Sequence, residues 1–285
     1  MHIDAKMVHG WTFFGAPVST FSGSTPRWRL SAPESYVLLN GPRASGVEAF
    51  KKALLELVAL GALIIQTRRE PTFLLFTREI RILLPGPKAP SVGLTVPPLV
   101  DAWELFAGTS VSWGRGVRTS DLGRSARARN LPLKDYARRV VMPALVERGL
   151  YRRAGDEDQG WFRTRPYVET AAGTAARAEL EAWMREIPHE FRASSEQDPS
   201  RALALVGMVG SAVLLMDPLF PELQRLSRLL RDMGEEKKIG AAFGLAMADI
   251  DLDSLASDWG AVDSAGGDFG SDGGGDGGDS GGGGD

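Results

Sequence analysis

The chain contains no cysteine, and this absence excludes several classes of protein at once. Without cysteine there is no disulfide, no thiolate ligand for a metal ion and no cysteine nucleophile. Histidine is almost as scarce, because His2, His9 and His189 are too few and too widely spaced to form a zinc site. We therefore predict a protein with no bound metal and no cofactor.

Long hydrophobic segments are absent as well. The longest apolar run, 202–216, is shorter than the roughly 20 residues that a membrane-spanning helix needs, and it favours a buried core helix. The N-terminus has no charged region followed by an apolar run, so we expect no signal peptide. Together with the lack of cysteine, these features predict a cytoplasmic protein whose membrane contact, if it has one, is peripheral and at the inner membrane surface.

No recognisable catalytic motif is present. The acidic run 156–158 is typical of a solvated hairpin turn, since two catalytic carboxylates must point into a common cleft. No serine in a nucleophile-elbow motif is available to act with His189. Gly207 and Gly210 precede no Lys-Ser/Thr phosphate loop, and the alternating aspartates of 249–253 lack the central glycine and terminal glutamate of a calcium loop. We predict no catalytic residues and a protein that is not an enzyme.

Charge of each sign is concentrated in a different part of the chain. The sequence holds 33 Lys and Arg against 36 Asp and Glu, a net charge of −3. Ten aspartates and no basic residue lie in 249–285, so residues 1–248 carry 26 acidic against 33 basic residues, a net charge of +7. The segment 115–153 is the most basic, with eleven basic and three acidic residues. The positive charge of residues 1–248 favours an anionic partner, phospholipid or nucleic acid. A solvated Arg-rich surface explains the same charge equally well.

Two segments of the chain end in almost the same way. Residues 53–63 read ALLELVALGAL and residues 144–150 read ALVERGL, and each apolar-periodic run closes on a glycine followed by a hydrophobic residue. A helix that ends with Gly61 or Gly149 at its C′ position and leads into a short strand explains both. The predicted fold class is mainly α with short β-hairpins, a helical domain built on two helix-plus-wing, or winged-helix-like, units.

The remaining patterns complete the predicted secondary structure. We predict a hairpin after Gly61 with its turn at 68–71, and a second hairpin after Gly149 around the acidic turn 156–160. The main helix of the second unit covers 132–148, with a kink at Pro143. Further helices are predicted at 31–39, 46–60, 99–107, 119–129, 170–187, 200–216 and 221–233.

We divide the chain into three parts. Residues 1–30 mix glycine, serine, proline and aromatic residues without a clear period, and we predict an N-terminal arm. The helical domain covers 31–248, with 31–87 as the first helix-plus-wing unit and 99–233 as the second unit and C-terminal helices. The segment 249–285, rich in glycine and aspartate, is predicted to be a disordered acidic tail.

The order of elements from residue 138 onward resembles a known family. Over 138–220 the chain contains RRVVMPALVERGLYRR, then WFRTRPYVETAAGTAARAELEAWM, then DPSRALALVGMVGSAVLLMDPLF. This is similar to the Golgi phosphoprotein family of phosphoinositide-binding adaptors and its bacterial relatives. In that family a helix ending Leu-Val-Glu-x-Gly-(Val/Leu) precedes a hairpin, a Thr-x-(Tyr/His)-Pro strand and an apolar helix that begins with Asp-Pro.

The first unit resembles the same family. LSAPESYVLLNGPRASGVEAFKKALLELVALGAL, from residue 30, looks like the family's opening helix, its turn and its first long helix. The resemblance covers roughly 30–232. The Gly-rich tail is not part of that family and looks more like the tails of bacterial proteins that carry a similar helical module.

The resemblance implies a mainly helical fold that binds phosphatidylinositol 4-phosphate headgroups without catalysis. The family's site uses a Trp and an Arg around the first long helix, and an Arg-x-x-Arg pair before Leu-Val-Glu-x-Gly. Here the second Arg of that pair falls on Arg138, whereas the first falls on Asp135 and the other two positions fall near Gly41 and Phe50. Neighbouring guanidinium groups could add generic phosphate contacts. The candidate ligands of an anionic headgroup are Arg138, Arg139, Arg152 and Arg153.

Three functions remain open at this point. The favoured one is a non-enzymatic peripheral membrane protein or adaptor that binds an anionic, phosphoinositide-like headgroup. In the second, the helical faces form a protein–protein interaction module with the Gly-rich tail as a flexible appendage. In the third, a winged-helix DNA-binding protein places the helix 132–148 in the groove, although that helix has Leu, Val, Ala and Pro where base-reading Arg, Asn or Gln would be expected.

Overall fold

The computed structural model describes residues 28–73, 76–89, 93–109, 116–155, 166–216 and 219–232. Most of the predicted arm, the acidic turn 156–160 and the tail 249–285 lie outside these residues. Within them the chain is mainly helical, with one three-stranded and one two-stranded antiparallel sheet. The predicted fold class, mainly α with short β-hairpins, is therefore confirmed.

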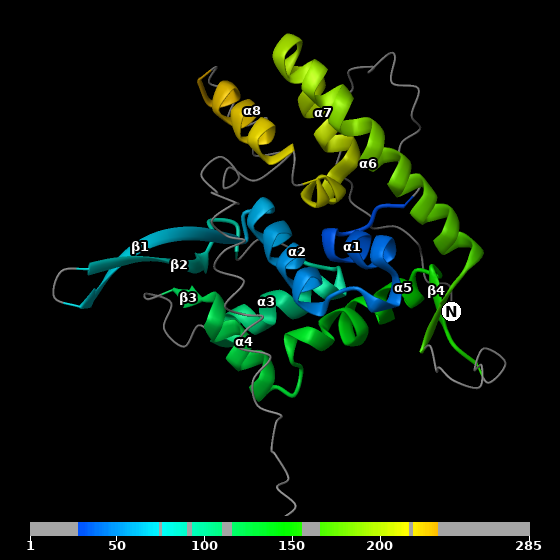
Figure 1. Cartoon of the computed structure of the whole chain (residues 1–285), viewed down its shortest axis with the longest axis horizontal. Helices are drawn as coiled ribbons and strands as arrows, with labels where there is room; N and C mark the ends of the chain where they lie inside the picture. The colour runs from blue at the N-terminus through cyan, green and yellow to red at the C-terminus, as the bar shows by residue number, and fades with distance from the viewer. Residues whose placement is uncertain are drawn as a thin grey trace, which may run out of the picture.

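Helices and strand pairs alternate along the chain (Figure 1). The α-helices are α1 Ala32–Asn40, α2 Gly46–Ala59, α3 Pro97–Thr109, α4 Thr119–Ala128, α5 Met142–Glu147, α6 Ala171–Gln197, α7 Pro199–Val209 and α8 Phe220–Asp232. The strands are β1 Leu63–Phe73, β2 Phe76–Pro85, β3 Val117–Arg118, β4 Tyr151–Arg153 and β5 Tyr167–Glu169. Shorter helical turns are η1 Gly41–Arg43, η2 Leu133–Asp135, η3 Ala137–Val141 and η5 Gly210–Leu215.

Helix α2 lies near the centre of the molecule, between the β1–β2 hairpin and α1 (Figure 1). Ser45 caps its first turn, because the Ser45 hydroxyl oxygen accepts a hydrogen bond from the Glu48 amide at 3.3 Å. Phe50, Leu54 and Leu57 on one face are at most 1% exposed. Burial of this face holds α2 against α1, α3 and η5 in one continuous core.

Both predicted helix ends have the geometry of a glycine C-cap. Gly61 follows α2 with a φ of 74°, and Gly149 follows α5 with a φ of 73°. In each case the glycine N–H donates to the carbonyl three residues back, and the next N–H donates to the carbonyl five residues back, at 2.8 to 3.0 Å. These two bonds define a Schellman motif, and a strand begins two residues after each glycine. The helix-to-strand transition predicted at both places is confirmed.

The first hairpin is longer than the sequence predicted, and the predicted turn at 68–71 is wrong. β1 pairs with β2 from Leu63 opposite Pro85 to Phe73 opposite Phe76, so 68–71 lie within the strand. A charged run before a proline is a common turn signal. Here, however, β1 is an edge strand in the order β1-β2-β3, where a missing N–H donor is tolerated. The register shifts just after Pro71, which is the local effect of the proline.

The predicted helix 132–148 forms as three successive helical segments, η2, η3 and α5, and Pro143 explains the change between the last two. Pro143 has no N–H to donate to the carbonyl four residues earlier, and its ring would clash with that carbonyl. The chain forms one wider turn instead, η3, in which the Met142 N–H donates to the Ala137 carbonyl five residues back. The defect predicted at Pro143 is real, and it leaves α5 with six residues.

Helix α6 ends ten residues beyond its predicted end and continues through Pro188. An internal proline costs a helix about 3 kcal/mol. Burial of large apolar side chains on both sides of it offsets this cost. These side chains are Trp183, Ile187 and Phe191. The predicted helix 200–216 is instead divided at Gly210, whose φ of 60° turns the chain from α7 into η5.

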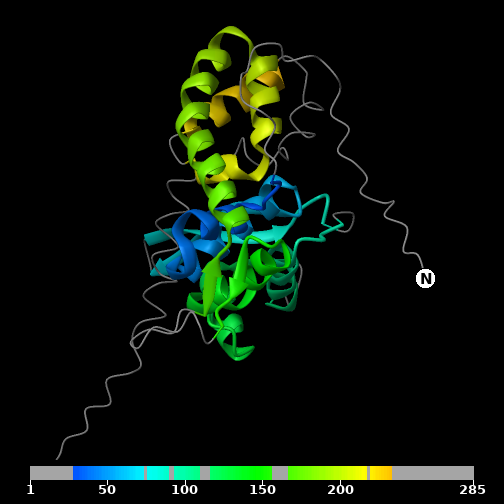
Figure 2. The same ribbon diagram turned by 90° about the vertical axis from the view of Figure 1, so that its right-hand side faces the viewer.

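The helices form three levels along the vertical direction of Figures 1 and 2. Helices α6, α7 and α8 occupy one end, α1 and α2 the middle, and α4, α5 and the β4–β5 hairpin the opposite end. The start of α6 reaches down to β5 and α1, so this long helix connects the levels. The buried side chains of all three levels belong to one hydrophobic cluster.

Candidate anion-binding surface

The second helix–hairpin unit carries the predicted arginines, and Tyr136 fixes its position. Tyr136 is fully buried, its ring packs edge-on against Phe50 of α2 with centroids 5.1 Å apart, and its hydroxyl donates to the Pro98 carbonyl of α3. Burial holds the pKa of Tyr136 well above its usual value, so the hydroxyl keeps its proton. Arg138 and Arg139, which follow this inward-facing anchor, are exposed.

Arg138 lies on the surface and is paired with an acid from its own turn. Its Nη2 is 3.0 Å from Asp135 Oδ1, and the two side chains are 58% and 22% exposed. An exposed pair of this kind contributes at most about 1 kcal/mol, so a multivalent anion can compete for Arg138. The Tyr167 hydroxyl of β5 donates to the Arg138 carbonyl at 3.4 Å, which places the second hairpin beside this turn.

Arg139 bridges its turn to the end of α4. Its Nη1 donates to the Asn130 carbonyl at 2.7 Å. Asn130 has a φ of 57° and closes α4 with the same pair of hydrogen bonds that Gly61 and Gly149 make. Arg139 is therefore partly a structural residue, although its side chain remains exposed.

Arg152 and Arg153 project from β4, the first strand of the short hairpin. Arg152 lies opposite Val168 and Arg153 lies opposite Tyr167 in the antiparallel register. Both arginines are exposed, whereas Tyr151 before them is buried. Because Tyr167, the partner of Arg153 in the register, also reaches the Arg138 carbonyl, the short hairpin lies beside the Arg138 turn.

The structure thus brings all four predicted site residues to the same end of the molecule, together with basic residues from α4 and η2. We call this set the arginine surface. It comprises Arg127, Arg129, Lys134, Arg138, Arg139, Arg152 and Arg153, all of them exposed. In the described segment 116–155 there are ten basic and three acidic residues, and all ten basic residues are exposed. The level formed by 171–232 has seven basic and nine acidic residues, so the positive charge is concentrated at one end.

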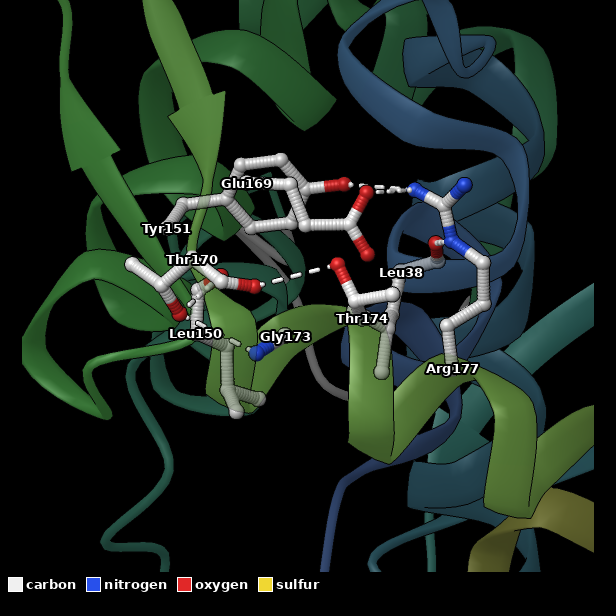
Figure 3. A network of polar contacts seen from close by, with 8 residues as sticks. All are labelled: Leu38, Leu150, Tyr151, Glu169, Thr170, Gly173, Thr174 and Arg177. Atoms are coloured by element: carbon white, nitrogen blue, oxygen red, sulfur yellow. Dashed lines mark hydrogen bonds and ion pairs between the residues drawn. The ribbon is translucent and has the colours of Figure 1, made fainter.

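Behind β4 lies a polar network centred on Arg177 of α6 (Figure 3). Arg177 Nη2 donates to Glu169 Oε2 at 2.5 Å and to the Tyr151 hydroxyl at 3.1 Å, and its Nε donates to the Leu38 carbonyl at 2.9 Å. One side chain therefore ties both strands of the second hairpin to the end of α1. This network supports β4, in which Arg152 and Arg153 are both exposed.

Thr170 joins the same hairpin to α6. Its Oγ1 accepts from the Gly173 amide at 3.0 Å and donates to the Gly149 carbonyl at 2.7 Å. Its own N–H donates to the Leu150 carbonyl at 3.1 Å. The N-cap of α6 and the C-cap of α5 are thus held by one threonine, which fixes the hairpin between two helix ends (Figure 3).

One arginine of the basic segment is used inside the fold. Arg148 Nε lies 2.6 Å from Glu34 Oε1, and the Glu34 side chain is fully buried. The other oxygen of Glu34 accepts from the Ser31 amide and hydroxyl, each at 2.8 Å. Removing one partner of a buried pair leaves an uncompensated charge and is strongly destabilising. Arg148 is therefore a structural residue and is not part of the arginine surface.

A second buried carboxylate, Glu56 of α2, joins three elements in the core. It accepts from the Ala32 amide at 2.6 Å and from the Ser211 hydroxyl of η5. Burial raises the pKa of Glu56 to about 7, and the Glu34 carboxylate adds to the rise, whereas its two hydrogen bonds lower it. No motif in the sequence marked this residue, because its partners lie 24 and 155 residues away.

The structure shows the surroundings of the three positions that depart from the pattern of the resembled family. Asp135, which stands where the family has an arginine, pairs with Arg138. Phe50 is fully buried against Tyr136 and is inaccessible to a ligand. Gly41 lies beside Arg177, whose Nη2 is 3.9 Å from the point where a side chain at Gly41 would begin.

Two further classes of site were searched for in the same part of the chain. No group of three or more His, Asp or Glu residues there could hold a metal ion. None of the helices in the described ranges is long and apolar enough to cross a membrane. Comparison of the chain with protein-family models, with curated proteins and with solved structures found no match.

Proposed function

We propose that this protein is a non-enzymatic, peripheral binder of anionic phospholipid surfaces, and that the arginine surface is its contact site. The observation that carries the proposal is the concentration of seven exposed basic side chains, all from residues 127–153, at one end of the fold. Each basic residue close to an anionic membrane contributes on the order of 1 kcal/mol. Several such contacts are enough for reversible binding without insertion.

The geometry of the surface supports a phosphate-rich partner. Arg138 pairs with one half-buried acid, Asp135. This exposed ion pair is weak enough for a phosphate group to displace Asp135 from Arg138. Guanidinium groups can bind phosphate oxygens in a bidentate manner, which favours Arg over Lys at such a surface. Six of the seven residues of the arginine surface are arginines.

Two alternative functions are less well supported. A DNA-binding winged helix needs a continuous recognition helix. The corresponding segment here is divided into η2, η3 and α5, and the apolar side chains of α5 face the core. A protein–protein module usually presents an exposed apolar patch, and Leu229 is the one exposed large hydrophobic side chain among the residues whose side chains the structure describes.

The proposal is tested by co-sedimentation of the full chain with vesicles of phosphatidylcholine alone and of phosphatidylcholine mixed with phosphatidylserine or a phosphoinositide. We expect binding to the anionic vesicles only, with an affinity that falls at least about tenfold when salt rises from about 0.1 M to 0.5 M. Duplex DNA at equal phosphate concentration serves as competitor. Absence of binding to all vesicles would contradict the proposal, and displacement by DNA at equal phosphate would favour the nucleic-acid alternative.

A further inference from the structure

The chain itself contains a second candidate for an anionic ligand of the arginine surface. Ten aspartates and no basic residue lie between positions 249 and 285, whereas the segment 116–155, which carries the arginine surface, has ten basic and three acidic residues. The level formed by α6, α7 and α8 carries more acidic than basic residues and would repel the same segment. Charge complementarity therefore selects one end of the described fold over the other.

Chain length allows this contact. Asp232, the last residue of α8, is followed by 53 residues. A flexible chain of that length has a root-mean-square span of about 40 Å and a maximum reach of about 175 Å. A globular chain of some 200 residues has a radius of gyration of only about 17 Å, so any point on its surface lies within reach.

We propose that the acidic segment 249–285 binds the arginine surface of its own chain and competes there with anionic lipid. The contact itself does not depend on any external ligand, whereas the competition rests on the proposed function. Because the segment is covalently attached, its effective concentration at the surface is in the millimolar range, high enough for a weak contact to matter. Exposed ion pairs are individually weak and are screened by salt, so the contact is reversible.

The lack of cysteine makes a direct distance measurement possible, because each introduced cysteine is a unique labelling site. Ser280→Cys places one spin label in the acidic segment. Ala128→Cys places the second on α4 between Arg127 and Arg129, and Ala193→Cys on α6 gives the matched control. Both alanines are exposed, so labelling should leave the core intact, which circular dichroism and the melting temperature would check.

We expect a population of short distances between positions 280 and 128 at about 0.05 M salt, and a longer, broader distribution between 280 and 193. The short population should disappear at about 0.5 M salt and in a full-length variant whose ten aspartates of 249–285 are replaced by asparagine. Equal distributions for the two pairs, unchanged by salt and by the asparagine variant, would overturn the proposal. So would a short distance that is lost on dilution with unlabelled chain, since that contact would join two copies.

A vesicle-binding experiment with the same two proteins distinguishes failure of this proposal from failure of the proposed function. The asparagine variant should bind phosphatidylserine vesicles at least about threefold more tightly than the natural chain at low salt, and equally at high salt. If neither protein binds vesicles while the short distance persists, the proposed lipid function fails and the internal contact stands. If both bind vesicles equally and no short distance is seen, the internal contact fails and the lipid function stands.

Discussion

The two helix–hairpin units end their helices with the same hydrogen bonds and then differ in almost everything else. In the first, α2 is a regular helix of 14 residues that leads into strands of 11 and 10 residues. In the second, α5 has six residues after a π-turn and leads into two strands of three residues. A glycine at C′ therefore determines how a helix ends, while the residues around it determine what the hairpin becomes.

The units also differ in what they do for the molecule. Five residues before its glycine, the first unit has the buried Glu56, whereas the second has the buried Ala144. The first unit thus places a polar junction in the core, where α1, α2 and η5 meet. The second unit has an apolar residue at the matching position and carries exposed arginines such as Arg138 and Arg153. Its polar junctions are made instead by Arg148, which pairs with Glu34, and by the hairpin residues Tyr151 and Glu169, which bond to Arg177.

The largest expected effect on stability comes from leucine-to-alanine substitutions in the two helices. These substitutions test whether the two helix ends are equally important to stability. Leu57 and Leu145 occupy the same place, four residues before their glycines, and each is fully buried. We expect Leu57→Ala and Leu145→Ala each to lower the free energy of unfolding by about 3 kcal/mol, measured by urea denaturation. A cost below about 1 kcal/mol for Leu145→Ala alone would mean that the broken helix contributes little to the core.

The second prediction concerns the carboxylate that only the first unit has. Since burial raises the pKa of Glu56 from 4.5 to about 7, the folded state holds its proton more tightly than the unfolded state does. Its contribution to stability is therefore full below pH 4.5 and is lost as the pH rises through about 7. The loss amounts to roughly 3 kcal/mol.

Glu56→Gln should abolish this part of the pH dependence, as measured by denaturation between pH 4.5 and 8. The amide can still accept from the Ala32 N–H and can donate to Ser211, so the fold should persist. Glu48→Gln is the matched control on the same helix, where the side chain is 39% exposed. A natural chain whose stability does not fall over this range, or a Gln variant with the same profile, would contradict the assignment.

A smaller effect tests the glycine caps themselves. Gly61→Ala and Gly149→Ala each force a side chain into the left-handed region, which costs roughly 1 to 2 kcal/mol. A side chain at Gly149 would meet nothing within 4 Å, whereas one at Gly61 would lie 3.2 Å from the Lys88 side chain. We therefore expect Gly61→Ala to be slightly more destabilising in thermal denaturation. Neutral substitutions at both positions would rule out the shared C-cap account.

The smallest effect on stability comes from the exposed pair of the second unit. Asp135→Asn removes the partner of Arg138, and an exposed pair separated by three residues contributes less than about 0.5 kcal/mol. The melting temperature should hardly change, while binding to anionic vesicles should increase a few-fold because Arg138 is released. Weaker vesicle binding by Asp135→Asn would indicate that Asp135 positions Arg138 for the ligand.

Much of the fold could be predicted from local sequence signals. Gly61 and Gly149 mark helix ends because few residues other than glycine adopt positive φ at low cost, and Pro143 marks a defect because it lacks an N–H. These local signals gave wrong predictions where tertiary contacts outweighed them. Pro188 is retained inside α6 by the buried side chains on either side of it, and residues 68–71 are held in β1 by pairing with β2.

The sequence allowed the candidate site residues to be named but not their structural support to be predicted. The family resemblance indicated Arg138, and the neighbouring Arg139, Arg152 and Arg153 were added as generic phosphate contacts; the assignment of these residues as a site stays a prediction, and the structure shows that all four are exposed. Their different roles could not be read from the sequence, because the partners are distant in the chain. Arg177 bonds to the Leu38 carbonyl 139 residues earlier, and Arg148 pairs with Glu34 across 114 residues.

The most direct test of the account compares two charge reversals of equal size in the full chain. Arg138→Glu with Arg153→Glu alters the arginine surface, and Arg185→Glu with Arg192→Glu alters exposed positions on α6. We predict that the first pair weakens binding to phosphatidylserine vesicles by at least about thirtyfold at low salt and the second by less than about twofold. Equal losses of vesicle affinity for both pairs would mean that binding depends only on the net charge of the chain. That result would contradict a defined binding surface.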